Sequence, residues 1–126
     1  MDHNQFKLAK IGVVMLGVKD LARAVGFYRD KLGMAVQHDG PEFAFLDGGG
    51  VTLALAVPLS RNSPAMVGAT EVVFSVEGVR EAYDALRARG VVFTHEPRNV
   101  TGPMWAANFC DPDGHRLSVF GPEKKP

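Results

Sequence analysis

The sequence predicts an α+β fold built from two tandem βαβββ modules. Short runs of β-branched and aromatic residues alternate with two amphipathic helical patterns, in the same order in each half of the 126-residue chain. A shift of 58 positions superimposes the halves, placing Val13, Val18, Leu21 and Val25 on Glu71, Val76, Val79 and Tyr83. An internal repeat of this kind usually decides the fold, so we expect two modules of one plan.

The first module begins with the β-branched run 11–18, after which Asp20 offers a side-chain oxygen to cap a helix. Gly33 is expected to end this helix. Its inward face is apolar at helical spacing and consists of Leu21, Val25, Tyr28 and Leu32. Glycine-rich turns then separate three expected strands, which cover residues 34–39, 42–47 and 51–57.

The segment 58–68 is rich in prolines and small polar residues and is expected to be a connecting loop. The second module repeats the plan with a strand over 71–76 and a helix that ends at Gly90. The inward face of this helix consists of Val79, Ala82, Tyr83 and Leu86. The last three expected strands cover residues 91–96, 104–110 and 115–120.

The composition fits one globular domain, because a chain of this length buries about two-thirds of its unfolded surface. Fourteen basic side chains balance fourteen acidic ones, which argues against nucleic acid or an anionic membrane as a partner. Cys110 is the only cysteine and is expected to be a buried thiol. With neither a membrane-length apolar run nor an apolar leader, we expect a cytoplasmic protein.

Two stretches carry a family resemblance. VKDLARAVGFYRDKLGM (18–34) resembles the first-module helix of the glyoxalase/bleomycin resistance protein/extradiol dioxygenase superfamily, also called the vicinal oxygen chelate (VOC) superfamily, and NFCDPDGHRLSVF (108–120) resembles its closing hairpin. The resemblance implies one VOC domain over residues 1–126, with modules at about 11–57 and 70–120 joined by a loop over 58–69. It also implies curved sheets that form a cup around a ligand cavity, and a homodimer.

Enzymes of this superfamily commonly hold a divalent metal through His or Glu on the first and last strands of each module. Carried onto this sequence, those positions are Val13, Ala54, Glu71 and Ser118, with Leu53 replacing Ala54 if the preceding turn differs in length. Alternation along the strand favours Ala54, because Leu53 belongs to the bulky face suited to packing under a helix. Only Glu71 has donor atoms suited to a hard cation, so we expect no metal cofactor.

The four histidines do not restore a metal site. His3 lies in the N-terminal tail and His115 in a turn, while His38 and His95 are expected at the surface near strand ends. A divalent metal remains only the minority alternative.

Alternation along the strands predicts which side chains face the cup. The expected lining is mostly apolar, with a few polar points, and consists of Val13, Met15, Phe43, Phe45, Thr52, Ala54, Glu71, Val73, Met104, Ala106, Asn108, Arg116, Ser118 and Phe120. Such a lining suits a flat or aromatic small molecule. The alternative is a cup filled by its own side chains. Trp105 has the opposite parity and is expected on the helix side.

Glu71 is the candidate catalytic residue. A carboxylate that faces an apolar cup is disfavoured as an anion unless it finds a partner, and such a group suits a general base. The alternatives for Glu71 are an ion pair with Arg116, which the shared face permits, and exposure at the mouth of the cup.

Three functions remain open on the sequence. The leading hypothesis is a metal-independent small-molecule binding protein, similar to the antibiotic-sequestering members of the superfamily. Bleomycin itself is cationic and would favour an acidic cleft, which this electrically neutral chain does not indicate. The second hypothesis is a lyase, isomerase or dioxygenase that uses Glu71 as base or as its sole protein carboxylate ligand. The third is a non-catalytic structural or regulatory subunit.

Overall fold

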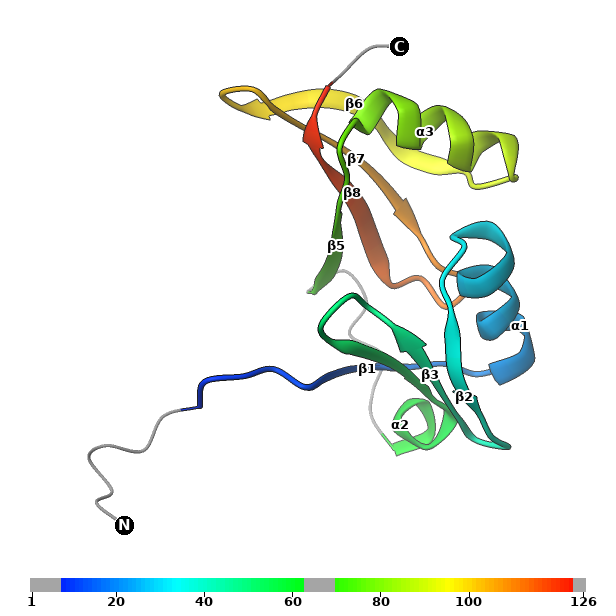
Figure 1. Ribbon diagram of the computed structural model, residues 1–126. Helices are drawn as coiled ribbons and strands as arrows, with labels where there is room; N and C mark the ends of the chain where they lie inside the picture. The colour runs from blue at the N-terminus through cyan, green and yellow to red at the C-terminus, as the bar shows by residue number, and fades with distance from the viewer. Residues whose placement is uncertain (1–7, 63–69, 124–126) are drawn as a thin grey trace, which may run out of the picture.

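The computed structural model describes residues 8–62 and 70–123, and its elements follow the predicted order (Figure 1). Module one consists of β1 (Val13–Gly17), α1 (Leu21–Gly26), the π-helical turn η2 (Phe27–Lys31), β2 (Val36–Asp39), β3 (Phe43–Asp47) and β4 (Thr52–Ala56). After α2 (Val57–Asn62), module two consists of β5 (Glu71–Ser75), α3 (Val79–Ala88), β6 (Phe93–Thr101), β7 (Met104–Cys110) and β8 (Arg116–Pro122). No helix in these residues is long and apolar enough to cross a membrane.

Each module forms its own four-stranded mixed sheet, and the two sheets have the same topology. The strand orders are β1-β4-β3-β2 and β5-β8-β7-β6. The first strand of each module pairs in parallel with the last, and the remaining neighbours are antiparallel. β5 begins 58 positions after β1, and α3 begins 58 positions after α1. The predicted pair of βαβββ modules is therefore confirmed.

The first helix differs from the second because it holds one more residue before the glycine that ends it. Gly33 and Gly90 both adopt positive φ, of 77° and 90°, and so terminate their helices in the left-handed conformation. The extra residue is accommodated in the π-helical turn η2, where the sequence predicts a regular helix. This wider turn directs both Phe27 and Tyr28 into the core, whereas the helical spacing indicates only Tyr28.

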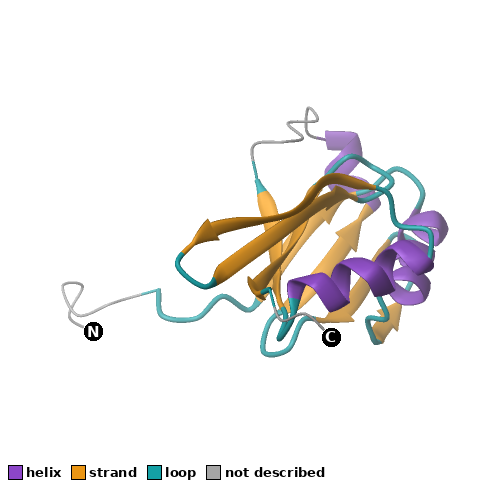
Figure 2. Cartoon of the chain, turned by 90° about the horizontal axis from the view of Figure 1, so that it is seen from above, coloured by secondary structure: helices purple, strands orange, loops and turns teal. Residues whose placement is uncertain are grey.

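The strands are amphipathic in the predicted sense. In β4, Leu53 and Leu55 are buried against the helix side, and Leu117 and Val119 do the same in β8. Figure 2, seen together with the labels of Figure 1, shows α1 and α3 on one side of the strands. No long helix covers the opposite face of either sheet in the described residues, although the short α2 lies against the Gly17 end of β1. Trp105 packs against the core on the helix side, as its parity predicts.

The largest differences from the predicted boundaries lie in the connecting loop and at the end of β6. The expected loop 58–68 begins with the short helix α2, because Pro58 is tolerated in the first turn of a helix; residues 63–69 lie outside the described part of the chain. β6 continues past Pro97 to Thr101, whereas the sequence predicts its end at Glu96. β6 is an edge strand, where a proline without an N–H group does not interrupt the sheet.

A polar contact joins the two modules at the turn before β8. Asp111 is buried, and its Oδ2 accepts a hydrogen bond from the Tyr28 hydroxyl at 2.8 Å. The other oxygen of Asp111 accepts the backbone N–H groups of Asp113 and His115, each at 2.9 Å. The His115 ring lies with Nε2 2.6 Å from the carbonyl oxygen of Gly17 in module one. This turn of module two is thereby bound to the first strand and helix of module one.

Tyr28 is expected to make stability depend on pH in the alkaline range. Burial, then the charge of Asp111 and the hydrogen bond to it, raises the pKa of Tyr28 above its ordinary value of about 10. The unfolded tyrosine ionises first, so the contribution of Tyr28 is complete below pH ~10 and is lost as the pH rises above that value. Tyr28→Phe should lower the free energy of unfolding by about 2 kcal/mol at pH 8, because it removes a hydrogen bond to a charged group.

Urea denaturation of both proteins between pH 8 and pH 11 measures this effect. The difference between wild type and Tyr28→Phe should shrink as the pH rises through 10. A difference that stays constant or grows would contradict the sign of the linkage.

Candidate functional site

The open face of the second sheet contains a cavity of about 450 Å³. All four strands of module two contribute to it, and its lining consists of Glu71, Val73, Arg98, Val100, Ala106, Asn108, Arg116, Ser118 and Phe120. The strand register explains this convergence, because residues paired across neighbouring strands share a face: Glu71 is paired with Arg116, and Arg98 with Ala106.

The polar side chains of this cavity form one hydrogen-bonded network around Glu71. Oε1 of Glu71 accepts from Nδ2 of Asn108 at 3.2 Å and forms an ion pair with Nη2 of Arg116 at 3.1 Å. Oε2 accepts from the Ser118 hydroxyl at 2.9 Å. Nη1 of Arg98 donates to Oδ1 of Asn108 at 2.7 Å. Both oxygens of Glu71 are therefore engaged.

The side chains of this network differ in how deeply they are buried. Asn108 and Ser118 are only 4% and 2% exposed, and buried polar side chains of this kind are stable only with partners. The side chains of Glu71 and Arg116 are more open, at 28% and 46% exposure. The geometry matches the ion pair with Arg116 that the sequence permits. A free general base at Glu71 would first have to give up these partners.

Half of the predicted cup lining surrounds this single cavity in module two. Seven predicted residues line the cavity, namely Glu71, Val73, Ala106, Asn108, Arg116, Ser118 and Phe120. Met104 is the first residue of β7, where it pairs with Pro122, and it is not part of the lining.

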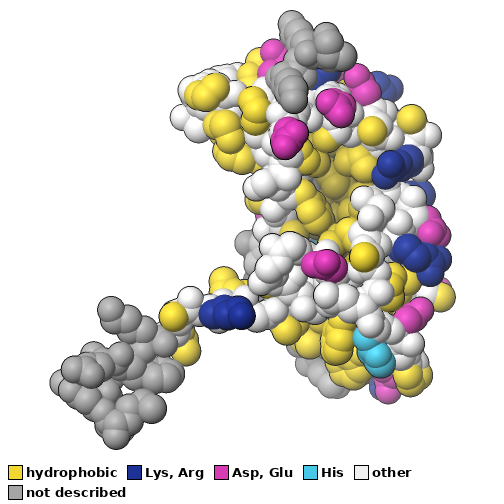
Figure 3. Space-filling view, viewed as in Figure 1, with side chains coloured by type: hydrophobic (Ala, Val, Ile, Leu, Met, Phe, Trp, Pro, Cys, Tyr) yellow, Lys and Arg dark blue, Asp and Glu magenta, His cyan; other side chains and the backbone are white. Residues whose placement is uncertain are grey.

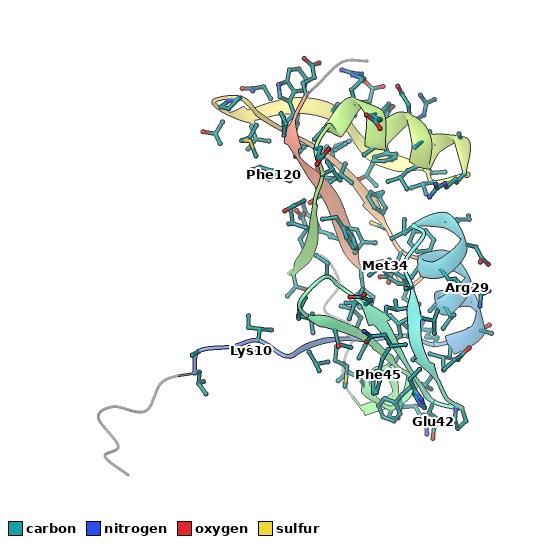
Figure 4. All side chains as sticks on the ribbon, viewed as in Figure 1. Lys10, Arg29, Met34, Glu42, Phe45 and Phe120 are labelled. Carbon is teal, nitrogen blue, oxygen red and sulfur yellow. The ribbon has the colours of Figure 1, made fainter. Side chains whose placement is uncertain are left out.

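The predicted residues of module one do not join them. Val13, Met15, Phe43, Phe45, Thr52 and Ala54 share the open face of the first sheet, as alternation predicts, but none of them lines the cavity on the second sheet. Figure 4 shows Phe120 on the second sheet and Phe45 on the first, well apart. The expected lining therefore divides between two sheet faces.

Arg98 and Val100 are the lining residues that sequence reasoning missed. Both belong to the part of β6 that follows Pro97, where the sequence predicts that the chain has left the sheet. One signal for them lies in the turn between β6 and β7: Gly102, with a φ of 52°, supports a tight hairpin, and a hairpin extends both strands to its ends. A hairpin closed at Gly102 brings Arg98 onto the sheet.

The four positions that correspond to metal ligands do not fit a metal. Val13 and Ala54 share the open face of the first sheet, while Leu53 is buried on the helix side, which supports the choice of Ala54 over Leu53. The side chains of Val13 and Ala54 have no donor atom for a metal. Glu71 and Ser118 lie in equivalent places on the second sheet, and they are hydrogen-bonded to each other. Within residues 8–62 and 70–123 there is no group of three His, Cys, Asp or Glu side chains that could hold a metal ion.

The histidines and the cysteine lie largely where the sequence places them. His38 and His95 are exposed on β2 and β6, and the ring of His38 lies beside Phe45 with centroids 5.4 Å apart. His3 lies outside the described residues. Cys110, expected to be buried, is only half-buried, because it ends β7 opposite the exposed Arg116.

A second cavity, of about 290 Å³, lies on the helix side between the modules. Its lining is apolar apart from Ser75, and it includes Leu32 and Met34 from module one with Phe74, Val76, Leu86 and Phe109 from module two. In Figure 3, hydrophobic side chains gather in the hollow between the two halves. No charged side chain lines this cavity, so we take the cavity on the second sheet as the candidate site.

Comparison with known proteins identifies the class. Residues 10–119 match the family described as the Glyoxalase/Bleomycin resistance protein/Dioxygenase superfamily, and the chain belongs to this superfamily. A bleomycin resistance protein from Geobacillus stearothermophilus is 28% identical over 122 residues, which cover 83% of this chain and 91% of that protein.

Two solved structures show the same fold. A glyoxalase/bleomycin resistance protein/dioxygenase from Nocardioides has a TM-score of 0.79 at 25% identity, over 97% of this chain and 89% of that one. TnmS3, an antibiotic binding protein from Streptomyces sp. CB03234, has a TM-score of 0.78 at 22% identity, over 94% of this chain and 99% of that one.

Proposed function

We propose that this protein is a small-molecule binding protein that takes an apolar or aromatic ligand in the cavity on the second sheet and needs no metal to do so. The observation that carries the proposal is the lining of this cavity. Val73, Val100 and Phe120 provide an apolar wall beside a polar network whose members are already hydrogen-bonded. A mostly apolar cavity with a few fixed polar groups is the usual form of a small-molecule site.

Two further observations support binding rather than catalysis. The only carboxylate in the lining, Glu71, is already held by three partners, and two of the four metal positions, Val13 and Ala54, have apolar side chains. The named relatives include an antibiotic binding protein, whose name states binding as its function, and a bleomycin resistance protein. We place the protein in the cytoplasm, in keeping with its single, unpaired thiol, Cys110.

The proposed working form is a homodimer. The open face of the first sheet exposes Val13, Met15 and Phe43, and the open face of the second exposes Val73 and Val100. Groups of exposed apolar side chains on one face commonly mark a contact surface. A second copy that covers these faces would also close the cavity from the solvent side.

A thermal-shift screen tests ligand binding. Planar antibiotics and aromatic metabolites are screened in the presence of EDTA, and a ligand at 100 times its Kd should stabilise the protein by about 2.7 kcal/mol. Ala106→Trp fills the cavity from the floor of the sheet and should abolish the shift. Val92→Trp places the same indole side chain at an exposed position outside the cavity and should retain the shift.

The melting temperatures of the two variants without ligand test whether both fold. Compounds that stabilise Ala106→Trp as much as wild type would show that the ligand binds outside this cavity. Compounds that stabilise the protein only when a divalent metal replaces EDTA would overturn the metal-independent mode of binding. A library without hits would refute the binding function.

A further inference from the structure

We infer that the ligand of this cavity carries an acidic group, a carboxylate or a similar oxyanion, which Arg98 binds while the apolar body of the ligand lies against Phe120 and Val73. This inference rests on the proposed function and names the chemical class of its ligand. The charge of the cavity is the first reason for it. The lining includes two guanidinium groups and one carboxylate, which gives a net charge of +1 in a chain whose overall charge is zero.

The single carboxylate does not cancel both arginines. Glu71 forms its ion pair with Arg116, and the hydrogen bonds from Asn108 and Ser118 occupy it further. Arg98 makes no ion pair within the described residues. It contacts the network only through the amide oxygen of Asn108, at 2.7 Å. The positive charge of Arg98 is therefore the one that the cavity offers to a ligand.

The network also holds Arg98 in position. Asn108 is buried, and its amide group is fixed at both ends, since its nitrogen donates to Glu71 and its oxygen accepts from Arg98. Only one nitrogen of the Arg98 guanidinium is used in this contact, and a guanidinium carries five N–H donors in a fixed plane. The remaining donors suit the two oxygens of a carboxylate. Arg98 is thus partly immobilised before a ligand binds, which reduces the entropy lost on binding.

The apolar wall favours a particular shape of anion. Val73, Val100 and Phe120 lie on the same face of the sheet as the two arginines. An inorganic anion would leave this wall in contact with water, whereas an aromatic acid covers it and places its charge at Arg98. A polycationic ligand is disfavoured for a different reason, because it would meet the net positive charge of the site.

Matched pairs of ligands test the inference. A panel of aromatic carboxylates, beginning with 2-naphthoate, is titrated by calorimetry beside the primary amide of each acid, here 2-naphthamide, and beside 2-naphthylmethylammonium. The acids should bind at least about tenfold more tightly than their amides, because a charge-assisted pair replaces a neutral contact. The ammonium compound should bind most weakly. Raising the salt concentration should weaken the acids and leave the amides unchanged.

Variants of Arg98 connect this preference to the residue. Arg98→Met should weaken the acids about tenfold and leave the amides within about twofold, while Arg98→Lys, which retains the charge but not the planar donors, should fall between. Arg29→Met is the control, because this substitution removes the same charge from the protein. Arg29 lies on the helix side of module one, remote from the cavity (Figure 4). The Arg29→Met substitution should change neither affinity.

The outcomes separate this inference from the function on which it rests. If amides or other uncharged compounds bind as tightly as the acids, or if Arg98→Met leaves the preference intact, the protein binds small molecules but the acidic group is wrong. If no acid, no amide and no ammonium compound binds, the proposed function fails, and the inference fails with it.

Discussion

Asp111→Ala is expected to lower the free energy of unfolding by about 4 kcal/mol. Asp111 is 5% exposed, and its carboxylate accepts three hydrogen bonds, from the Tyr28 hydroxyl and from the backbone N–H groups of Asp113 and His115. Each buried donor that loses its acceptor costs about 1–3 kcal/mol, and water entering the site offsets part of that cost. Urea denaturation at neutral pH measures the change.

Asp30→Ala is the matched control for this substitution. Asp30 is an exposed carboxylate that pairs with its neighbour Arg29, and exposed pairs contribute about 0–1 kcal/mol. A loss for Asp111→Ala that does not exceed the loss for Asp30→Ala would show that the contact between the modules does not stabilise the fold. The Tyr28→Phe variant should retain more stability than Asp111→Ala, because it leaves both backbone donors satisfied.

Much of the fold is predictable from the sequence because the repeat and the strand alternation both reflect local chemistry. A strand in which Leu53 and Leu55 alternate with Thr52 and Ala54 can bury only one of its faces under a helix, whatever the rest of the chain does. Tyr28 shows the limit of this reasoning. Its burial follows from helical spacing, but the π-helical turn that buries Phe27 beside it depends on a single additional residue before Gly33.

The site is predictable to the extent that it lies within one sheet. Alternation brings Glu71, Asn108 and Ser118 to one face, and their hydrogen bonds follow from that placement. Alternation does not give the position of one sheet relative to the other, because that position depends on contacts such as the one at Asp111. An Asp-Pro-Asp-Gly sequence indicates only a turn. The division of the predicted cup between two faces is therefore beyond the sequence.

The same substitution on the two faces of the sheets should have very different effects. Phe109→Ala is expected to lower the free energy of unfolding by about 4 kcal/mol, because Phe109 is 1% exposed, contacts the Phe93 ring and borders the cavity between the modules. Phe43→Ala should cost about 1 kcal/mol or less in dilute protein, since Phe43 is 38% exposed on the open face of the first sheet. Urea denaturation of both variants makes the comparison, and equal losses would contradict the assignment of the two faces.

The dependence of these stability losses on protein concentration tests whether Phe43 contacts a second copy of the chain. If the open face of the first sheet only contacts water, the loss for Phe43→Ala is the same at every protein concentration. If a second copy covers that face, wild type gains stability as the concentration rises and the variant gains less, so that the difference between them widens. Phe109 lies on the helix side, away from that face, and its loss should not change with concentration. The pair of variants therefore separates a core contact within one chain from a contact between chains, whatever ligand the cavity binds.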